Sequence, residues 1–224
     1  MFRVHIVNKF NKNSYADQLE QQFRLRHEIY IGERGWTDIA RADGREIDQF
    51  DNDDTIYLLG ITPAGEVVGG SRLVPSLKPH LMSEVFPNLA PDGVPRGKEI
   101  YEWTRIFIAP ALRTPSRPAL AAGLIYCGIQ EYCVESKIEN LSIVCETYWI
   151  DRLASLGWKP RLLGPVYSHQ GGDIVGLITD TNTGALNATR SFYRIEEPVL
   201  QYIAGDQAIS EHQYTEQKSA TARR

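Results

Sequence analysis

Long hydrophobic runs are missing from this sequence. No stretch of the 224 residues approaches the ~20 consecutive apolar residues that a membrane-spanning helix needs. The apolar run within residues 1–9 is also too short for the core of a secretory signal. We therefore expect a cytoplasmic protein with no membrane partner.

Cysteine is scarce and forms no recognisable pattern. Cys127, Cys133 and Cys145 are odd in number and include no Cys-x-x-Cys pair, which argues against a disulfide framework and against a zinc site. We expect three reduced, mostly buried thiols. The five histidines are scattered, and none has a second His or Cys at a ligand spacing, so no metal site is expected.

A strong excess of one charge is absent as well. The formal net charge is -4, and no long Lys/Arg run is present, so neither nucleic acid nor an anionic membrane is an expected partner. A hydrophobic content of 42% in 224 residues allows one sizeable core. We expect a single domain over residues 1–205 and a disordered polar tail over residues 206–224.

The sequence does contain a series of short apolar segments. Runs rich in β-forming residues at 55–61 and 66–74 flank Thr62-Pro63-Ala64-Gly65 and predict a hairpin. Hairpins followed by strand and helix alternation indicate a mixed sheet with helices packed on it. Further strands are expected at 99–109, 141–145, 158–163 and 174–180, and helices from Ser14 to Gly32 or Gly35, at 118–136 and at 148–156.

Charged residues stand on faces that look buried. In the first predicted helix, Leu19, Phe23, Arg26 and Tyr30 follow one another at spacings of four, three and four, so they share one face. A charge on that inward face needs a partner. The polar, acidic segment 37–54 is expected to be a long loop, of the kind that is often functional.

The charged and aromatic residues form a family-like pattern: Arg26, Tyr30, Trp36, Asp48, Asp51, Arg72, Glu102 and Arg105. This order and spacing, from about residue 15 to residue 158, resembles the LuxI-type acyl-homoserine-lactone synthases, with Tyr30 where the family usually has Phe. The resemblance implies an α/β (α+β) fold of the GNAT-like type, with a mixed, mostly antiparallel twisted sheet and helices on both faces. It also implies quorum-sensing signal synthesis, with S-adenosylmethionine as acyl acceptor, methylthioadenosine as by-product and no prosthetic group.

The implied acceptor carries a carboxylate, an ammonium and a sulfonium. Its site must offer a cation for the first group and anions or aromatic faces for the others. We expect these contacts from Arg26, Arg72 or Arg105 for the carboxylate, from Asp48 and Asp51 for the cationic end, and from Trp36 with Tyr30 for the sulfonium or the adenine.

The first chemical step is attack of the α-amine on the thioester carbonyl. An α-amine has a pKa near ~8, so at neutral pH a base must take its proton. Glu102 is the expected base, directly or through water, and Arg105 is the second expected catalytic residue. Period-two alternation puts these two on opposite faces of their strand unless a β-bulge lies between them. We expect an oxyanion donor from the backbone N–H groups of residues 106–108, and an intramolecular lactonisation as the second step.

The acyl donor is either acyl-CoA or an acyl carrier protein. Segments 43–46, 82–87 and 146–149 resemble the subgroup that takes short branched or aryl acyl groups from CoA. Bulky rings shorten an acyl pocket, and the expected pocket residues are Trp103, Thr104, Tyr126, Tyr148 and Trp149. Arg113 and Arg117 are placed to meet the phosphates of either carrier, and we expect a monomer or a weak dimer.

Two other functions compete with this one. The first is an ordinary GNAT N-acetyltransferase using acetyl-CoA, whose pyrophosphate cradle is a Gly-containing loop that enters a helix. Residues 111–118 contain no glycine, which counts against it. The second is a non-catalytic module that binds S-adenosylmethionine or an acyl ligand. The presence of Glu102 beside Trp103 and Arg105 counts weakly against this alternative.

Overall fold

The computed structural model describes residues 1–114, 119–169 and 172–202. Its strands are β1 (Arg3–Val7), β2 (Ile56–Ile61), β3 (Val67–Pro75), β4 (Ile100–Ile108), β5 (Asn140–Glu146), β6 (Arg161–Leu162), β7 (Tyr167–His169), β8 (Gly172–Asp180) and β9 (Leu200–Gln201). Its helices are α1 (Ala16–Arg26), α2 (Leu81–Glu84), α3 (Leu120–Glu135), α4 (Tyr148–Ser155) and α5 (Thr183–Tyr193). A π-helix, His27–Glu33, continues α1, and single 3-10 turns lie at Lys12–Tyr15, Thr37–Ile39, Pro87–Leu89 and Pro110–Leu112.

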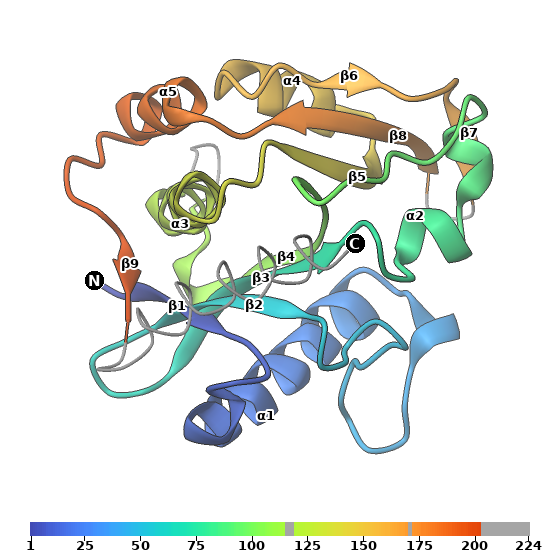
Figure 1. Ribbon diagram of the computed structural model, residues 1–224. Coiled ribbons are helices and arrows are strands. Elements are labelled where there is room, and N and C mark those ends of the chain that lie inside the picture. Colours follow the sequence, from blue (N-terminus) through green and yellow to red (C-terminus); the bar gives the residue numbers. More distant parts are fainter. Residues whose placement is uncertain (115–118, 170–171, 203–224) are drawn as a thin grey trace, which may run out of the picture.

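One sheet of nine strands runs through the molecule (Figure 1). Eight strands follow the order β6-β8-β5-β4-β3-β2-β1-β9, and β7 pairs with β8. The pairs β1 with β9 and β4 with β5 are parallel, and the other pairs are antiparallel. The predicted mixed, mostly antiparallel sheet is therefore confirmed.

Helices cover both faces of the sheet. In Figure 1, α3 and α5 lie on one side of the strands β1 to β4 and α1 lies on the other. The strand β2 is buried on both faces: Ile56 and Leu58 enter the core under α3, whereas Tyr57 and Leu59 enter a smaller core against α1. A strand covered twice is apolar along its whole length, which explains the continuous run from Ile56 to Ile61.

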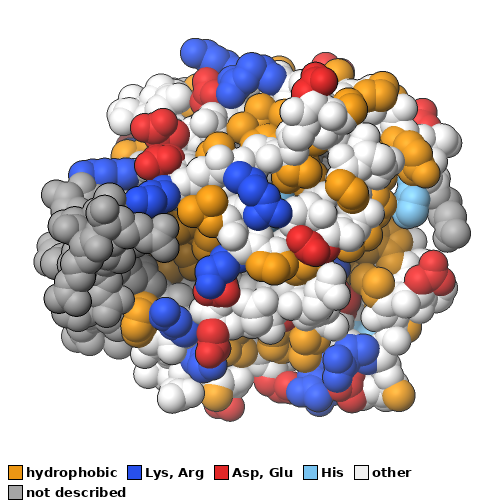
Figure 2. All heavy atoms as spheres, turned by 45° about the vertical axis from the view of Figure 1, so that its right-hand side comes forward, with side chains coloured by type: hydrophobic (Ala, Val, Ile, Leu, Met, Phe, Trp, Pro, Cys, Tyr) orange, Lys and Arg blue, Asp and Glu red, His pale blue; other side chains and the backbone are white. Residues whose placement is uncertain are grey.

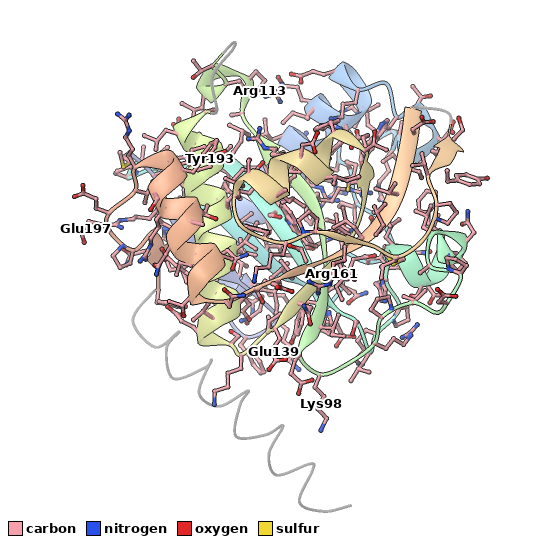
Figure 3. The ribbon with its side chains drawn as sticks, turned by 90° about the horizontal axis from the view of Figure 1, so that it is seen from above. Lys98, Arg113, Glu139, Arg161, Tyr193 and Glu197 are labelled. Carbon is pink, nitrogen blue, oxygen red and sulfur yellow. The ribbon has the colours of Figure 1, made fainter. Side chains whose placement is uncertain are left out.

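The helix α3 is buried on nearly every side, and α5 packs alongside it, with Tyr193 of α5 against Gly123 of α3 (Figure 3). The free thiols of Cys127 and Cys133 on α3 and of Cys145 on β5 are all buried, as predicted. Burial raises the pKa of Cys127 and of Cys145 to about 12, so these thiols stay protonated and unreactive at neutral pH.

The sheet opens between β4 and β5. These two strands are in parallel register only where Ile100–Glu102 faces Asn140–Ser142, so within the described residues β4 has no partner on β5 from Trp103 onward. On its other side β4 is irregular: Arg72 pairs with Thr104 and Gly70 with Phe107, so one residue of β3 stands opposite two of β4. Arg105 has a φ of +54° there. This is the β-bulge that Glu102 and Arg105 need in order to share one side of the strand, and it lies at Arg105 itself.

Some sequence-based expectations differ from the structure. The predicted strand at 158–163 is reduced to the two residues of β6, because Trp158 is buried in the core and its carbonyl accepts a bond from Asp180. The elements β1, α2, α5, β7 and β9 were not predicted. The predicted tail at 206–224 lies outside the described residues. No described helix is long and apolar enough to cross a membrane.

Candidate active site

Six charged side chains meet where α1, β3 and β4 face the acidic loop. They are three arginines, Arg26, Arg72 and Arg105, and three acids, Glu46, Asp48 and Asp51, and we refer to them as the salt-bridge network. The acidic loop has little regular structure, and these ion pairs hold it against the sheet. The three positive and three negative charges of the salt-bridge network cancel, and this balance allows so many charges to be buried together.

Two pairs in the salt-bridge network are bidentate, Arg26 with Asp51 and Arg72 with Asp48. Arg26 donates to both oxygens of Asp51, from Nη1 at 2.8 Å and from Nη2 at 2.9 Å. Arg72 donates likewise to both oxygens of Asp48, at 2.6 and 2.9 Å. A planar guanidinium fits a carboxylate in this way with two parallel bonds, which fixes orientation as well as charge.

Asp51 lies at the centre of the network and is fully buried. Burial alone would raise the pKa of its carboxyl group, but Arg72 and Arg26 outweigh burial and hold that pKa well below its usual range. Tyr57 donates a further hydrogen bond to it at 2.9 Å. Asp51 is therefore ionised at neutral pH, and its carboxylate binds both Arg26 and Arg72.

Arg105 connects this network to an aromatic pair. Its Nη2 donates to Asp48 at 2.9 Å and to Glu46 at 3.0 Å, while its guanidinium lies 5.6 Å from the ring centre of Tyr30 and 6.0 Å from that of Trp36. The bulge thus turns Arg105 to the side of the sheet on which Arg72 also binds Asp48. Three arginines predicted from the sequence are in this way brought together.

Tyr30 and Trp36 stack on each other with ring centres 4.9 Å apart and an angle of 18° between the rings. The hydroxyl of Tyr30 donates to the carbonyl of Ile106 at 2.7 Å, which holds the π-helix against the bulged part of β4. Burial raises the pKa of Tyr30 to about 12, although Arg105 acts in the opposite direction. Arg34 lies against the same two rings, 5.7 and 5.6 Å from their centres.

A pocket of about 70 Å³ occupies the opening between β4 and β5. Its walls come from both faces of the sheet, because Tyr30 and Trp36 belong to the α1 side and Trp103 and Trp149 to the core under α3. The full lining is Tyr30, Arg34, Trp36, Trp103, Thr104, Arg105, Ile106, Ile143, Val144, Cys145, Glu146 and Trp149. Such a pocket has a cationic and aromatic side and an apolar side.

Not every predicted residue lines this pocket. Arg26, Arg72 and Asp51 are completely buried beneath it, and their polar atoms bind one another. Asp48 keeps a small exposed fraction and faces Arg72 and Arg105.

The predicted acyl-pocket residues divide in the same way. Trp103, Thr104 and Trp149 line the pocket, whereas Tyr126 lies behind the two tryptophans, with its ring centre 6.1 Å from that of Trp103. Tyr148 is 54% exposed and stacks on the outside of Trp149.

Glu102, the predicted base, lies beside the first turn of α2 with no exposed surface. Its Oε1 accepts hydrogen bonds from Nδ1 of His80 at 3.0 Å and from the amide of Met82 at 2.6 Å, and its Oε2 accepts one from the amide of Leu81 at 2.8 Å. Three donors stabilise a negative charge on this carboxylate. Glu102 shares its sheet face with Thr104 and Arg72, since alternate residues of a strand point the same way and Arg72 donates to Thr104 at 2.9 Å.

The two arginines expected to meet carrier phosphates are placed differently. Arg113 lies near the start of α3 (Figure 3), donates to the carbonyl of Ile108 at 2.9 Å and pairs with Glu33. Arg117 lies outside the described residues.

Four residues of the site were not predicted from the sequence. Glu46 stood within a segment noted only for its family likeness, yet it is buried between Arg26 and Arg105. Arg34 and Glu146 form an ion pair of 2.9 Å across the pocket, joining residues 112 positions apart in the chain. His80 was set aside because no ligand spacing accompanied it. Of these four residues, only Arg34 could have been found from the sequence, because it lies between Tyr30 and Trp36 in the chain.

Comparison with known proteins agrees with this geometry. Residues 10–185 match the family model described as autoinducer synthase. The chain is 42% identical over 162 residues to the isovaleryl-homoserine lactone synthase of Bradyrhizobium diazoefficiens, which covers 72% of each chain. It is also similar to the structure of MesI, a CoA-dependent acyl-homoserine lactone synthase, with 44% identity, a TM-score of 0.80 and coverage of 88% of this chain and 98% of that one. BjaI, another such synthase, solved with SAM and isopentyl-CoA, gives 34% identity, a TM-score of 0.83 and coverage of 90% and 93%.

The fold and the relatives define an acyltransferase with a GNAT-like architecture, as predicted. An acyl-CoA N-acyltransferase from Pseudomonas aeruginosa shares the fold alone, with 12% identity, a TM-score of 0.55 and coverage of 78% and 97%. Within this class the chain belongs to the autoinducer synthase family, and it is an acyl-homoserine-lactone synthase. The predicted family and activity are confirmed.

Proposed function

We propose that this synthase transfers a short branched or aryl acyl group from coenzyme A to the amine of S-adenosylmethionine, then closes the lactone and releases methylthioadenosine. The observation that carries the proposal is the pocket through the opening between β4 and β5. One of its sides is cationic and aromatic and suits the acceptor, and the other is apolar and suits the acyl group. The two CoA-dependent relatives support the choice of donor.

The acceptor end of the proposal rests on Tyr30, Trp36 and Arg105. The stacked rings offer π-faces to the sulfonium and to the adenine, and Arg105 is the one network arginine that lines the pocket, so it is the proposed partner of the carboxylate. Arg26 and Arg72 are fully buried and already paired. Their proposed role is to hold Asp48 and Asp51, and through them the acidic loop and Arg105, in position.

The acyl end rests on Trp103 and Trp149. Their ring centres lie 5.7 Å apart at 83°, and both belong to a cluster of rings in the main core. A wall of this size and rigidity leaves little depth for a straight alkyl chain, and a hydrophobic pocket discriminates by about 1–3 kcal/mol per methylene group. A compact branched or aryl group is therefore the proposed donor substituent.

Proton removal is assigned to the group around Glu102, which shares the sheet face of Arg72 and Thr104. The oxyanion of the tetrahedral intermediate is proposed to bind backbone N–H groups of β4 near Ile106, where the strand has left its partner on β5. Lactonisation is intramolecular and requires mainly that the acceptor is held in a bent conformation.

Surface charge bears on the choice of donor on the face that Figure 2 shows. On the face shown in Figure 2, acidic and basic side chains of the described residues are interspersed, without a uniformly basic area. A carrier protein with an acidic surface would call for a complementary basic one. We propose a cytoplasmic enzyme that acts as a monomer or weak dimer.

Mass spectrometry of the products tests the proposed function. Purified protein is incubated with S-adenosylmethionine and a panel of acyl-CoA and acyl-carrier thioesters, beside a Glu102→Gln control. The expected result is an acyl-homoserine lactone and methylthioadenosine from a short branched or aryl acyl-CoA, with slower formation in the control. Products made only from carrier-protein thioesters would reverse the donor assignment, and acylated amines made without S-adenosylmethionine would remove the acceptor.

A further inference from the structure

His80 is a buried histidine that the pocket and the salt-bridge network leave unexplained. It has no exposed surface, and its Nδ1 lies 3.0 Å from Oε1 of Glu102. Its second ring nitrogen, Nε2, is also buried and has no hydrogen-bond partner among the described residues. Buried polar atoms are nearly always satisfied, so an unpartnered one beside a buried carboxylate calls for an explanation, either a bound water or a chemical role.

The surroundings of Glu102 fix the tautomer of His80. Both oxygens of Glu102 accept bonds, from the amides of Leu81 and Met82 as well as from the ring. A carboxylate held by these amides is an acceptor only, so Nδ1 of His80 must carry the proton. In a neutral imidazole the other nitrogen then has a free lone pair, which places an unoccupied proton acceptor on Nε2.

We propose that Nε2 of His80 takes the proton of the acceptor amine during acylation and that Glu102 is the positioning residue that orients the ring. This inference rests on the proposed function and assigns one step within it. An imidazole has an ordinary pKa near about 6.5 and a glutamic acid near about 4.3. Since the best general base has a pKa close to the working pH, the ring suits the removal of an amine proton better than the carboxylate does.

Charge favours the same assignment. With a neutral ring the pair carries one buried negative charge, and protonation of Nε2 turns it into a neutral imidazolium and carboxylate pair, which costs less to bury. Protonation of Glu102 itself would instead weaken the bonds from Leu81 and Met82, because a carboxylic acid is a poorer acceptor than a carboxylate.

The step balances in atoms and charge. The ammonium gives one proton to Nε2 through water, and the free amine attacks the thioester carbon to form the C–N bond. When the tetrahedral intermediate collapses, the C–S bond breaks and the nitrogen gives its second proton to the departing thiolate, which leaves as the thiol. The third hydrogen remains on the amide, and Nε2 returns its proton to solvent.

Other charged groups on the surrounding elements are neutralised or exposed. Arg72 on β3 is bound by Asp48 and Asp51, and Lys78 before α2 pairs with Asp54. On the elements packed around the pair, Glu84 at the end of α2 and His169 on β7 are both exposed, and β5 presents Ser142 opposite Glu102. Among the residues that the structure describes, His80 is thus the one buried imidazole next to Glu102.

The pH dependence of acylation tests the inference. His80→Asn keeps an N–H donor for Glu102 but removes the proton acceptor, and release of the CoA thiol from isovaleryl-CoA is followed from pH 5 to pH 9. The expected result is a kcat about 100-fold lower, the lower end of what a positioned base contributes. The acidic limb of the profile should be lost or moved to lower pH, while KM for S-adenosylmethionine stays unchanged. The matched control His169→Asn should keep the profile of the unsubstituted enzyme.

A profile of His80→Asn that matches the unsubstituted enzyme, or a lower kcat without any change in the acidic limb, overturns the inference. The failure of the proposed function is distinct, because then the unsubstituted enzyme makes no lactone from any acyl-CoA. If His80→Asn does not fold, ¹⁵N NMR of the unsubstituted, histidine-labelled enzyme decides. A proton on Nδ1 and none on Nε2 at pH 7 is expected, and a proton on Nε2 contradicts the assignment.

Discussion

Trp149 is a single residue whose side chain limits the depth of the proposed acyl pocket. It lines the pocket, is 9% exposed, and meets Trp103 edge to face inside the core. The ring is held rigidly by this packing, so the depth of the acyl pocket depends on its size. Its removal leaves space into which a longer acyl chain can extend.

We predict that Trp149→Ala shifts the preference of the enzyme toward longer straight acyl groups. The ratio of kcat/KM for a longer acyl-CoA to that for isovaleryl-CoA should rise by on the order of 10-fold, since each methylene in a hydrophobic pocket is worth about 1–3 kcal/mol. Asp151→Ala, an exposed position on the same helix, is the matched control and should leave the ratio unchanged. An unchanged ratio in both variants would place the end of the acyl pocket elsewhere.

At the scale of elements, the position of α3 on the sheet depends on a glycine. A Cβ at Gly128 would lie 2.8 Å from Cγ1 and 3.0 Å from Cβ of Val4, on the strand β1 beneath it. Neither atom can move far, because Val4 is itself fully buried in a paired strand. The helix therefore approaches the sheet more closely than any other residue at 128 would allow.

We predict that Gly128→Ala destabilises the protein by about 1–3 kcal/mol, the usual result of overpacking a core. Gly32→Ala is the control, because nothing lies within 4 Å of a Cβ there, and it should stabilise the chain by roughly 0.4–1 kcal/mol through the unfolded state. Urea unfolding followed by circular dichroism measures both. Equal effects at the two positions would show that α3 has room to shift.

Helices and strands could be predicted from the sequence where the segment has an apolar face or is apolar all round. The hairpin of β2 and β3 and the long α3 follow from local pattern and spacing, whereas the bulge in β4 was only a condition for Glu102 and Arg105 to meet. The helix α5 was missed because Thr183–Tyr193 contains few large apolar residues, although Asn182 accepts a bond from the amide of Ala185 at 3.0 Å and is a typical N-cap. The site divides similarly, since buried partners such as Glu46 and His80 are chosen by tertiary contacts that no local pattern records.

At the scale of the whole molecule, the salt-bridge network links stability to pH. Asp51 is fully buried and is held ionised by Arg72 and Arg26, despite burial, so its pKa in the folded state lies well below its ordinary value of about 3.9. A depressed pKa adds stability that is complete above the unfolded value and is lost as the pH falls toward the folded value. The acidic loop should therefore loosen below about pH 4.

We predict that Asp51→Asn lowers the free energy of unfolding at pH 7 by about 3–5 kcal/mol, because it leaves buried arginines without their anion. The difference in the free energy of unfolding between the variant and the unsubstituted protein should shrink as the pH falls from 5 to 3. Only the unsubstituted protein has an ionised Asp51 whose contribution can be lost. Urea titrations at several pH values measure this. A difference that stays constant down to pH 3 would contradict the linkage, and Asp92→Asn, at an exposed position, is the control.

The two walls of the pocket are stabilised by different forces. Ion pairs hold the side of Tyr30 and Arg105, whereas aromatic packing holds the side of Trp103 and Trp149. Apart from the ion pair of Arg34 with Glu146 across the pocket, the contacts that hold each wall lie on that wall's own side. Natural variation can therefore alter the acyl group of the signal, and with it the community of cells that responds, while the machinery that handles the common lactone precursor is inherited unchanged.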